Sequence, residues 1–407
     1  MTDSIPNRAS CFYARPVADP NQRSTDALRE FNRGRILDAL SRTGSATRAE
    51  IGATTGLARS TVTDLVGELL AEQRLLDIAG DQLTERRAGR PSRRLVLAPT
   101  SDLSIGIDFG HSHCRTGVID ALGRVLAVRS AILDVDSSPV GVLERARAMV
   151  AELLSGLGTD RHRVVGAAIG LPAPVNTVRG TVGPGNVLPQ WVDRHPADEL
   201  QAALELPVQV ENDANLGALG EMAFGAARSF TDVIYVKAST GIGAGLVLGG
   251  RLYRGSTGRA GEIGHVPIDP AGAVCRCGNR GCLESVASVT QVLAMLQPAH
   301  EETLTMTRLA ELVRLEDAGA NRVLGDAGRL IGRVLADMVN NLNPGVVVLG
   351  GELALAGEPL LVGVRDSLDR FAQPDMVRDL AVRIGTLAEN AQLIGAGALV
   401  LSPDRSS

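Results

Sequence analysis

Three cysteines stand close together in the segment CRCGNRGC, at Cys275, Cys277 and Cys282, and His265 precedes them by ten residues. A Cys-x-Cys pair in a glycine-rich knuckle, a third thiolate and one imidazole are the ligand set of a closed tetrahedral zinc site, in which the metal is structural. The alternative is a group of buried thiols without metal, which this spacing does not favour. We therefore expect one structural zinc ion per chain, held by these four residues.

A second polar group begins in the segment VENDANLGALGE, where Asn212 and Asp213 stand at the junction of an expected strand and helix. A carboxylate at such a junction faces a cleft and can accept a hydrogen bond from a sugar hydroxyl or act as a base towards it. Glu262 and His265 in GEIGH, and Glu284 after the cysteines, add polar groups nearby. The alternative for Asp213 is a helix cap.

Two glycine-rich turns could hold a phosphate, because glycine lets backbone amides approach an anion closely. Neither turn is specific by itself, since any tight β-turn in a two-lobed fold needs glycine. The residues concerned are Asp108, Gly110 and Ser112 in the first turn, and Thr240, Gly241 and Gly243 in the second.

The elements that must position these groups alternate strands with helices and glycine turns, which indicates α/β layers. Buried strands are expected in SIGIDFG, VVGAAIGLP and GVVVLGG, and helices near 143–154, 327–341 and 392–401. Two similar βββαβα lobes with a cleft between them fit this order.

The first hundred residues follow a different pattern. Helical spacing of apolar residues predicts helices at about 28–43, at 48–55 and from residue 59, and two short strands follow at 75–78 and 94–97. Three helices and a two-stranded wing make a winged helix-turn-helix. The polar, proline-containing segment before them predicts a flexible arm.

This head carries side chains suited to DNA. Short polar and basic groups at the start of the third helix can reach base edges in a major groove, and arginines of the wing can lie along phosphates. The alternative is a packing module whose arginines are merely solvated. The expected DNA contacts are Arg48, Arg59, Ser60, Thr61 and Thr63 of the helices, and Arg87, Arg90 and Arg93 of the wing.

Composition agrees with a basic head on an acidic body. Residues 1–100 contain 15 arginines and 12 acidic residues, a net charge of +3, which leaves −8 for the rest of a chain whose total is −5. We find no apolar run of membrane-spanning or signal-peptide length, so we expect a cytoplasmic protein that is nucleoid-associated when bound to DNA. The single lysine, Lys237, among arginines is typical of coding bias.

The motifs VENDAN, GEIGHVPID and CRCGNRGCLE, in this order after a DxG strand, resemble the ROK family of repressors and sugar kinases from about Ser104 to Leu401. The head, whose wing ends in GRPSRR, resembles that of the family's regulators. The resemblance implies an actin-like, hexokinase-like ATPase fold that closes on a sugar, with a structural zinc knuckle. It assigns the sugar contacts to Asn212, Asp213, Glu262, His265 and Glu284, with Asp213 as the counterpart of the kinases' catalytic base.

The expected organisation is therefore an arm, a DNA-binding head and a two-lobed sensor. The boundaries are 1–25 for the arm, 26–98 for the winged helix-turn-helix and 103–401 for the sensor, with a small lobe at about 103–210 plus 390–401 and a large lobe at about 211–389.

The chain departs from the kinase pattern at the first phosphate loop. The kinases carry Asp-x-Gly-Gly-Thr-Lys, whereas His111 here replaces the second glycine and the lysine is absent. Both changes argue against ATP as a cofactor. The second loop is nearly intact, and the adenosine-site glycines Gly350 and Gly351 remain.

We expect a sugar-responsive repressor that binds an inverted-repeat operator as a homodimer or homotetramer, with a monosaccharide or sugar phosphate as effector. A sugar kinase with an added DNA-binding head is the alternative, and a constitutive repressor with a vestigial sensor is the third possibility.

Overall fold

The computed structural model describes residues 29, 32–37, 39–40, 43–72, 74–78, 93–98, 102–159, 161–176, 179–183 and 187–401. The predicted arm lies outside these residues. The chain forms two compact units, Met1–Thr100 and Ser101–Ser407.

The first unit is a winged helix-turn-helix. Helical residues between positions 29 and 43 precede α2 (Arg48–Thr55) and α3 (Arg59–Ala71), and β1 (Leu75–Ile78) pairs antiparallel with β2 (Arg94–Leu97). A capping box starts α2, and Gly56 ends it with φ of 66°. The helices and strands share an aliphatic core formed by Ile36, Leu40, Ala46, Ile51, Val62, Leu65, Val66, Leu69, Leu75 and Leu95.

The second unit contains two five-stranded sheets with the same strand order. Each sheet begins with a three-stranded antiparallel meander, and two parallel strands continue from its first strand. This repeat confirms the two similar lobes predicted from the sequence. The first sheet has the order β5 (Val125–Ile132), β4 (His113–Asp120), β3 (Leu103–Gly110), β6 (Val164–Leu171) and β9 (Val208–Asn212); the second has β12 (Arg251–Leu252), β11 (Ile242–Leu248), β10 (Val233–Ala238), β13 (Val346–Gly350) and β14 (Ala381–Ile384).

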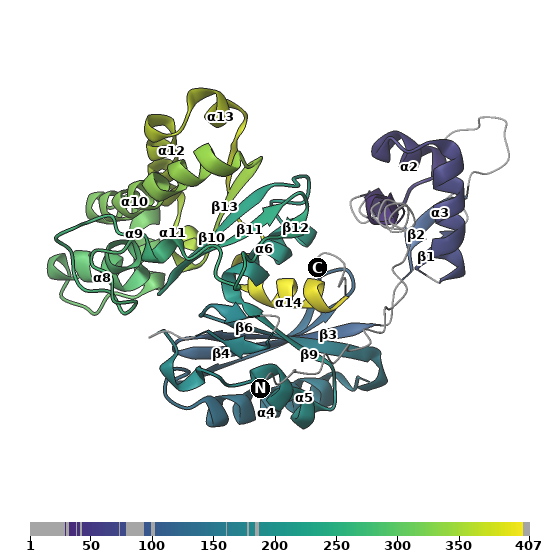
Figure 1. Ribbon diagram of the computed structural model, residues 1–407, viewed down its shortest axis with the longest axis horizontal. Helices are drawn as coiled ribbons and strands as arrows, with labels where there is room; N and C mark the ends of the chain where they lie inside the picture. The colour runs from purple at the N-terminus through teal and green to yellow at the C-terminus, as the bar shows by residue number, and fades with distance from the viewer. Residues whose placement is uncertain are drawn as a thin grey trace, which may run out of the picture. The chain divides into compact units, whose positions relative to one another are not determined.

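Helices cover both sheets (Figure 1). On the first sheet, α4 (Pro139–Leu157) and α5 (Pro196–Leu204) lie on one face. A second short pair of strands, β7 (Val175–Asn176) and β8 (Thr181–Val182), follows β6. The helices that accompany the second sheet are α7 (Glu284–Ala287), α8 (Val289–Leu296), α9 (Met306–Arg314), α10 (Ala318–Leu342), α11 (Glu352–Ala356), α12 (Glu358–Phe371) and α13 (Pro374–Asp379).

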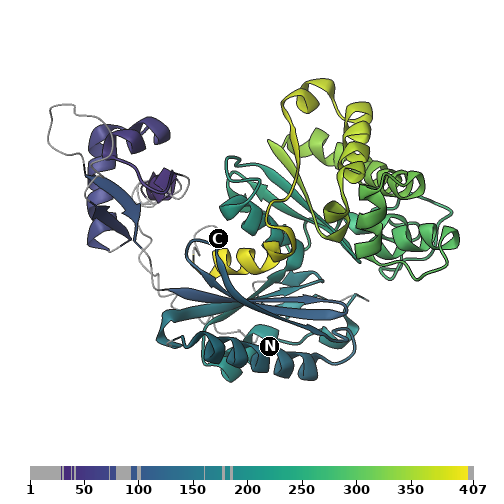
Figure 2. The same ribbon diagram turned by 180° about the vertical axis from the view of Figure 1, so that it is seen from behind.

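Two helices, α6 (Asp213–Phe224) and α14 (Ala391–Leu401), lie between the sheets. Both views in Figures 1 and 2 show α14 above the first sheet and below the second. The approach is close because glycine faces the helix: a Cβ on Gly106 of β3 would come within 2.8 Å of the carbonyl oxygen of Leu393. The first sheet is therefore covered on this face by a helix from the far end of the chain.

Helix α10 is longer than the sequence pattern predicts. It begins at Ala318, whereas we expected it near Ala327, because glycines within it weakened the helical pattern. The glycines of the missed segment are Gly319 and Gly325, and a Cβ on Gly325 would lie 3.6 Å from the carbonyl oxygen of Pro359 on α12. Inside the predicted range α12 comes closer still: a Cβ on Gly328 would meet the carbonyl oxygen of Leu360 at 2.3 Å, and one on Gly332 would meet that of Val364 at 2.6 Å. The glycines allow two helices to pack closely, which local propensity does not reveal.

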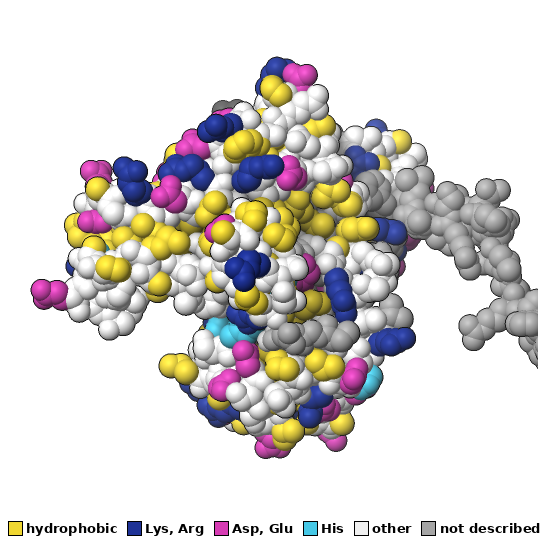
Figure 3. All heavy atoms as spheres, turned by 60° about the vertical axis from the view of Figure 1, so that its left-hand side comes forward, with side chains coloured by type: hydrophobic (Ala, Val, Ile, Leu, Met, Phe, Trp, Pro, Cys, Tyr) yellow, Lys and Arg dark blue, Asp and Glu magenta, His cyan; other side chains and the backbone are white. Residues whose placement is uncertain are grey.

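None of the helices in the described part of the chain combines the length and apolarity needed to cross a bilayer. On the face drawn in Figure 3, positive and negative side chains are interspersed.

Candidate functional site

A cavity of about 560 Å³ opens between the two lobes of the second unit. All five predicted sugar contacts line it, as do all six residues of the two predicted phosphate turns. The cavity thus brings together segments from both sheets, from α6 and from the residues on either side of the cysteine cluster, His265 and Glu284. It is also lined by groups that the sequence interpretation did not select, namely His113, Arg115, Lys237, Glu352 and Gln392.

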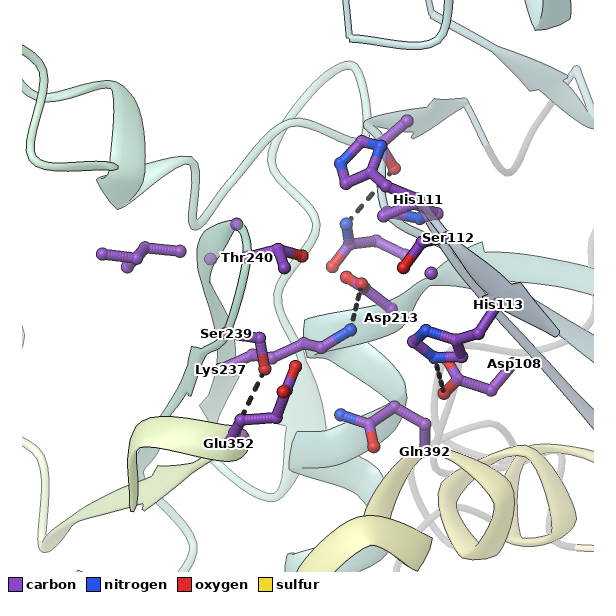
Figure 4. A pocket seen from close by; sticks show the side chains of 18 of the residues that line it. Asp108, His111, Ser112, His113, Asp213, Lys237, Ser239, Thr240, Glu352 and Gln392 are labelled. Atoms are coloured by element: carbon purple, nitrogen blue, oxygen red, sulfur yellow. Dashed lines mark hydrogen bonds and ion pairs between the residues drawn. The ribbon is translucent and has the colours of Figure 1, made fainter. Parts of the chain in front are cut away.

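Asn212 and Asp213 take different parts at the junction of β9 and α6. Asn212 is the N-cap: its side-chain oxygen accepts from the backbone N–H groups of Ala214 and Asn215, and its amide donates to the carbonyl of Ala173. The capping that we weighed for Asp213 thus belongs to its neighbour. Asp213 is buried as the first residue of α6, and its carboxylate faces the cavity (Figure 4).

Lys237 forms an ion pair with Asp213. Its Nζ lies 2.6 Å from Oδ2 of Asp213, and the two side chains are 14% and 9% exposed. The other carboxylate oxygen, Oδ1, accepts from the backbone N–H of Ala214 at 2.7 Å. Both oxygens of the predicted sugar-binding carboxylate are therefore already engaged by the protein.

Glu262 and Glu284 add acidic groups to the lining of the cavity. Burial, together with the charges of Asp213 and Glu284, raises the pKa of Glu262 to about 7. Glu284 accepts from the backbone N–H of Ile242 at 3.1 Å, which fixes the second glycine turn against α7. A sugar in this cavity would meet carboxyl groups that can accept from its hydroxyls.

The four predicted zinc ligands converge, with their ligand atoms all within 4.8 Å of one another. Sγ of Cys277 lies 3.7 Å from Sγ of Cys282, and Sγ of Cys275 lies 3.6 Å from Nδ1 of His265. A tetrahedron with zinc–sulfur bonds of about 2.3 Å has edges of about 3.8 Å. The residues therefore fit a zinc ion. Nε2 of His265 points the other way, 3.7 Å from Glu262 in the cavity.

His111 of the first glycine turn contacts residues of both lobes. His111 Nδ1 lies 2.7 Å from Asp136, and its Nε2 lies 3.3 Å from Arg276 of the cysteine knuckle, so the residue joins the two lobes. Arg276 also lies 3.4 Å from Glu284. The imidazole of His111 thus lies beside the backbone amides of the turn that a phosphate would have to approach.

Asp108, in the same turn, is buried. His113 lies 3.9 Å from its Oδ2, and Oδ1 has no hydrogen-bond partner among the described groups. Burial would raise the pKa of Asp108, but His113 and the charge of Lys237 outweigh burial and hold it below its ordinary value.

The predicted DNA contacts belong to the other unit. Arg59, Ser60 and Thr63 are exposed at the start of α3, whereas Thr61 is half-buried. Arg48 begins α2, and exposed Arg93 lies 3.4 Å from Asp77 of the wing. Arg87 and Arg90 lie outside the described residues.

Known proteins resemble this chain along most of its length. The profile described as "ROK family" matches residues 104–402. A xylose repressor of Bacillus spizizenii is 29% identical over 374 residues, covering 92% of this chain and 96% of that protein.

Two solved structures give the same comparison in three dimensions. A ROK family transcriptional regulator, a homologue of the Escherichia coli Mlc protein, has a TM-score of 0.70 and 26% identity, covering 92% of this chain and 96% of that chain. A ROK family glucokinase from Streptomyces griseus, in complex with glucose and AMPPNP, has a TM-score of 0.66 and 30% identity, covering 73% and 98%. The regulator match includes the first unit, whereas the glucokinase match has about the extent of the second unit.

Proposed function

The chain belongs to the ROK family, and we propose that it is a transcription repressor whose winged unit binds operator DNA and whose two-lobed unit binds a monosaccharide. The observation that carries the proposal is the union, in one chain, of an exposed recognition helix with a cavity lined by sugar-binding residue types. Matches to repressors over 92% of the chain support it.

We expect the effector to be a neutral sugar. Asp213, Glu262 and Glu284 all line the cavity, and the ammonium of Lys237 is already paired. Arg115, which also lines the cavity, lies 3.4 Å from Glu389 and donates to Asn390. A phosphate group would therefore meet carboxylates and cations that are already paired, and like charges at close range are unfavourable. Xylose and glucose, which appear in the descriptions of relatives, are the first sugars to test.

Zinc has a structural part in this proposal. His265, Cys275, Cys277 and Cys282 would hold the ion, which supplies a rigid centre for a short segment with little core of its own. The imidazole of His265, fixed through Nδ1, would present Nε2 to the sugar.

Sugar can change DNA affinity only by binding one arrangement of the protein more tightly than another. Closure of the lobes around the cavity is the change we propose, and a homodimer would convert it into a change in the spacing of two heads.

The test combines two measurements on the full-length protein. A thermal-shift screen of xylose, glucose and their phosphates should give stabilisation by a neutral sugar alone. Selection from a random duplex library should yield a bound sequence with twofold symmetry, and the stabilising sugar should alter its affinity. Failure to select any sequence would contradict the repressor proposal.

The second candidate function is a sugar kinase carrying a DNA-binding head. Asp213 and the turn around Thr240 and Gly241, both in the cavity, favour it. Against it stand the imidazole of His111 and the ion pair of Asp213 with Lys237. Release of ADP from ATP in the presence of the stabilising sugar, at about 1–100 per second, would establish the kinase.

A further inference from the structure

The chain contains a single lysine among its 41 basic residues, and this lysine lies in the cavity. Coding bias explains why arginine replaces lysine elsewhere, but it does not explain why position 237 is exempt. An ammonium is a compact point charge on a flexible stem, whereas a guanidinium is a wide planar fork. The exception thus marks a place where a small, buried cation is needed.

The second sheet carries Lys237 on its central strand, β10. On β10, Lys237 follows Val233 and Tyr235 at alternate positions, on the face turned towards α6. Its cross-strand neighbours are Gly243 on β11 and Gly350 on β13. Figure 4 shows its side chain reaching Asp213 in the cavity.

The ammonium lies among carboxylates. Asp213 is its hydrogen-bond partner at 2.6 Å, and the charges of Asp108 and Glu352 also act on it. Burial lowers the pKa of Lys237, but the carboxylates of Asp213 and Asp108 outweigh burial and raise it above its ordinary value. The lysine is therefore charged at neutral pH.

Without this cation, Asp108 would depend on His113 and Arg115 for compensation, and Asp213 on the backbone N–H of Ala214. Asp108 and Asp213 are both buried, and one oxygen of Asp108 has no hydrogen-bond partner among the described groups. Carboxylates placed beside phosphate-type glycine turns are the protein ligands that Mg²⁺ takes together with a nucleotide. Lys237 supplies positive charge at this place from the protein itself.

We propose that Lys237 is a built-in counter-ion that takes the place of a divalent metal ion between Asp108 and Asp213. It balances the charge of the cavity in the absence of a metal–nucleotide complex and repels a divalent ion from the same carboxylates. The inference deepens the proposed function and rests on it in one respect: a sensor must bind its sugar without a nucleotide. Lys237 thus allows the cavity to bind a sugar without a metal–nucleotide complex.

The experiment measures Mn²⁺, as a spectroscopic substitute for Mg²⁺, bound to zinc-loaded full-length protein by electron paramagnetic resonance. The wild type should bind no Mn²⁺ in the cavity, whereas Lys237→Met should bind about one ion per chain, at least roughly tenfold more tightly than any wild-type binding. Adding Asp108→Asn to Lys237→Met should abolish the new site. Arg365→Met, which removes an exposed charge on α12, should behave as the wild type.

The outcomes separate this inference from the repressor proposal, because neither DNA nor sugar enters the measurement. A wild type that binds one Mn²⁺ dependent on Asp108 would overturn the counter-ion role, whether or not the variant folds. So would a folded Lys237→Met that binds none. Lys237→Gln, measured in parallel, removes the same charge with a polar side chain and keeps the test valid if the Met variant unfolds.

Discussion

Asp213 connects the fold of α6 with the chemistry of the cavity. Its carboxylate accepts from the first turn of the helix and from Lys237, so it is oriented before any ligand arrives. An oriented acceptor loses little freedom when a sugar hydroxyl donates to it.

Replacing this carboxylate tests the sugar site. Asp213→Ala should abolish stabilisation by the sugar that the screen identifies, and should lower the unfolding free energy by about 1–3 kcal/mol because a buried ammonium loses its partner. Thermal shift with and without sugar measures both effects. Asp375→Ala, which breaks an exposed ion pair with Arg378 on α13, should change neither. A sugar response that survives Asp213→Ala would remove Asp213 from the site.

Local sequence could select Asn212 and Asp213, which line the cavity, and the four clustered histidine and cysteine residues, because each stands in a short motif with recognisable spacing. It could not reveal the contact between Lys237 and Asp213, which are 24 positions apart and join only when β10 lies beside α6. The link between His111 and Arg276 spans 165 positions and depends on how the lobes meet. The only signal for Lys237 was its rarity, which we took for coding bias.

At the scale of elements, the bounds of α2 could be predicted because both of its ends carry local signals. Thr47 and Glu50 form the capping box of α2, and Gly56 ends it. The start of α10 could not, because Gly319 and Gly325 lower the helix propensity of its first turns. Tertiary packing overrides propensity at such positions.

The segment from Cys275 to Cys282 is the element that the proposed zinc ion would order. Cys277→Ser should release zinc and lower the melting temperature of the second unit, because metal binding and folding are coupled at such sites. Elemental analysis should give about one zinc per wild-type chain and none for the variant. Cys114→Ser, at a buried thiol outside the cluster, should retain the metal. Zinc retained by Cys277→Ser would contradict the ligand assignment.

Helix α3 and the wing should contribute differently to DNA binding. Arg59→Ala should weaken binding to the selected sequence by about 1–3 kcal/mol and to random DNA much less, because base contacts carry specificity. Arg93→Ala should weaken both and reduce the salt dependence by about one ion. Fluorescence anisotropy over a salt series measures each. Equal losses on both DNAs for Arg59→Ala would assign it to phosphate.

At the scale of the whole second unit, Arg276 links the lobes through His111 and Glu284. Arg276→Ala should raise the sugar concentration needed for the DNA response a few-fold, since partly exposed charge contacts contribute about 0.2–1 kcal/mol each. DNA binding without sugar should not change. Arg280→Ala, in the same knuckle, is the matched control. An unchanged sugar response in Arg276→Ala would show that the link has no part in closure.

The position of α14 has a consequence for how the protein is made. Strand β3 leaves the ribosome early, yet the helix that covers it is synthesised only after the entire second lobe. Until then, the face of β3 that carries Gly106 lacks its contact with Leu393, and the first lobe cannot complete its packing. The winged unit has its own core and can fold long before. A nascent chain can therefore carry a finished winged unit ahead of an unfinished second unit, and a ribosome that stops before residue 391 leaves a folded winged unit without a complete second unit.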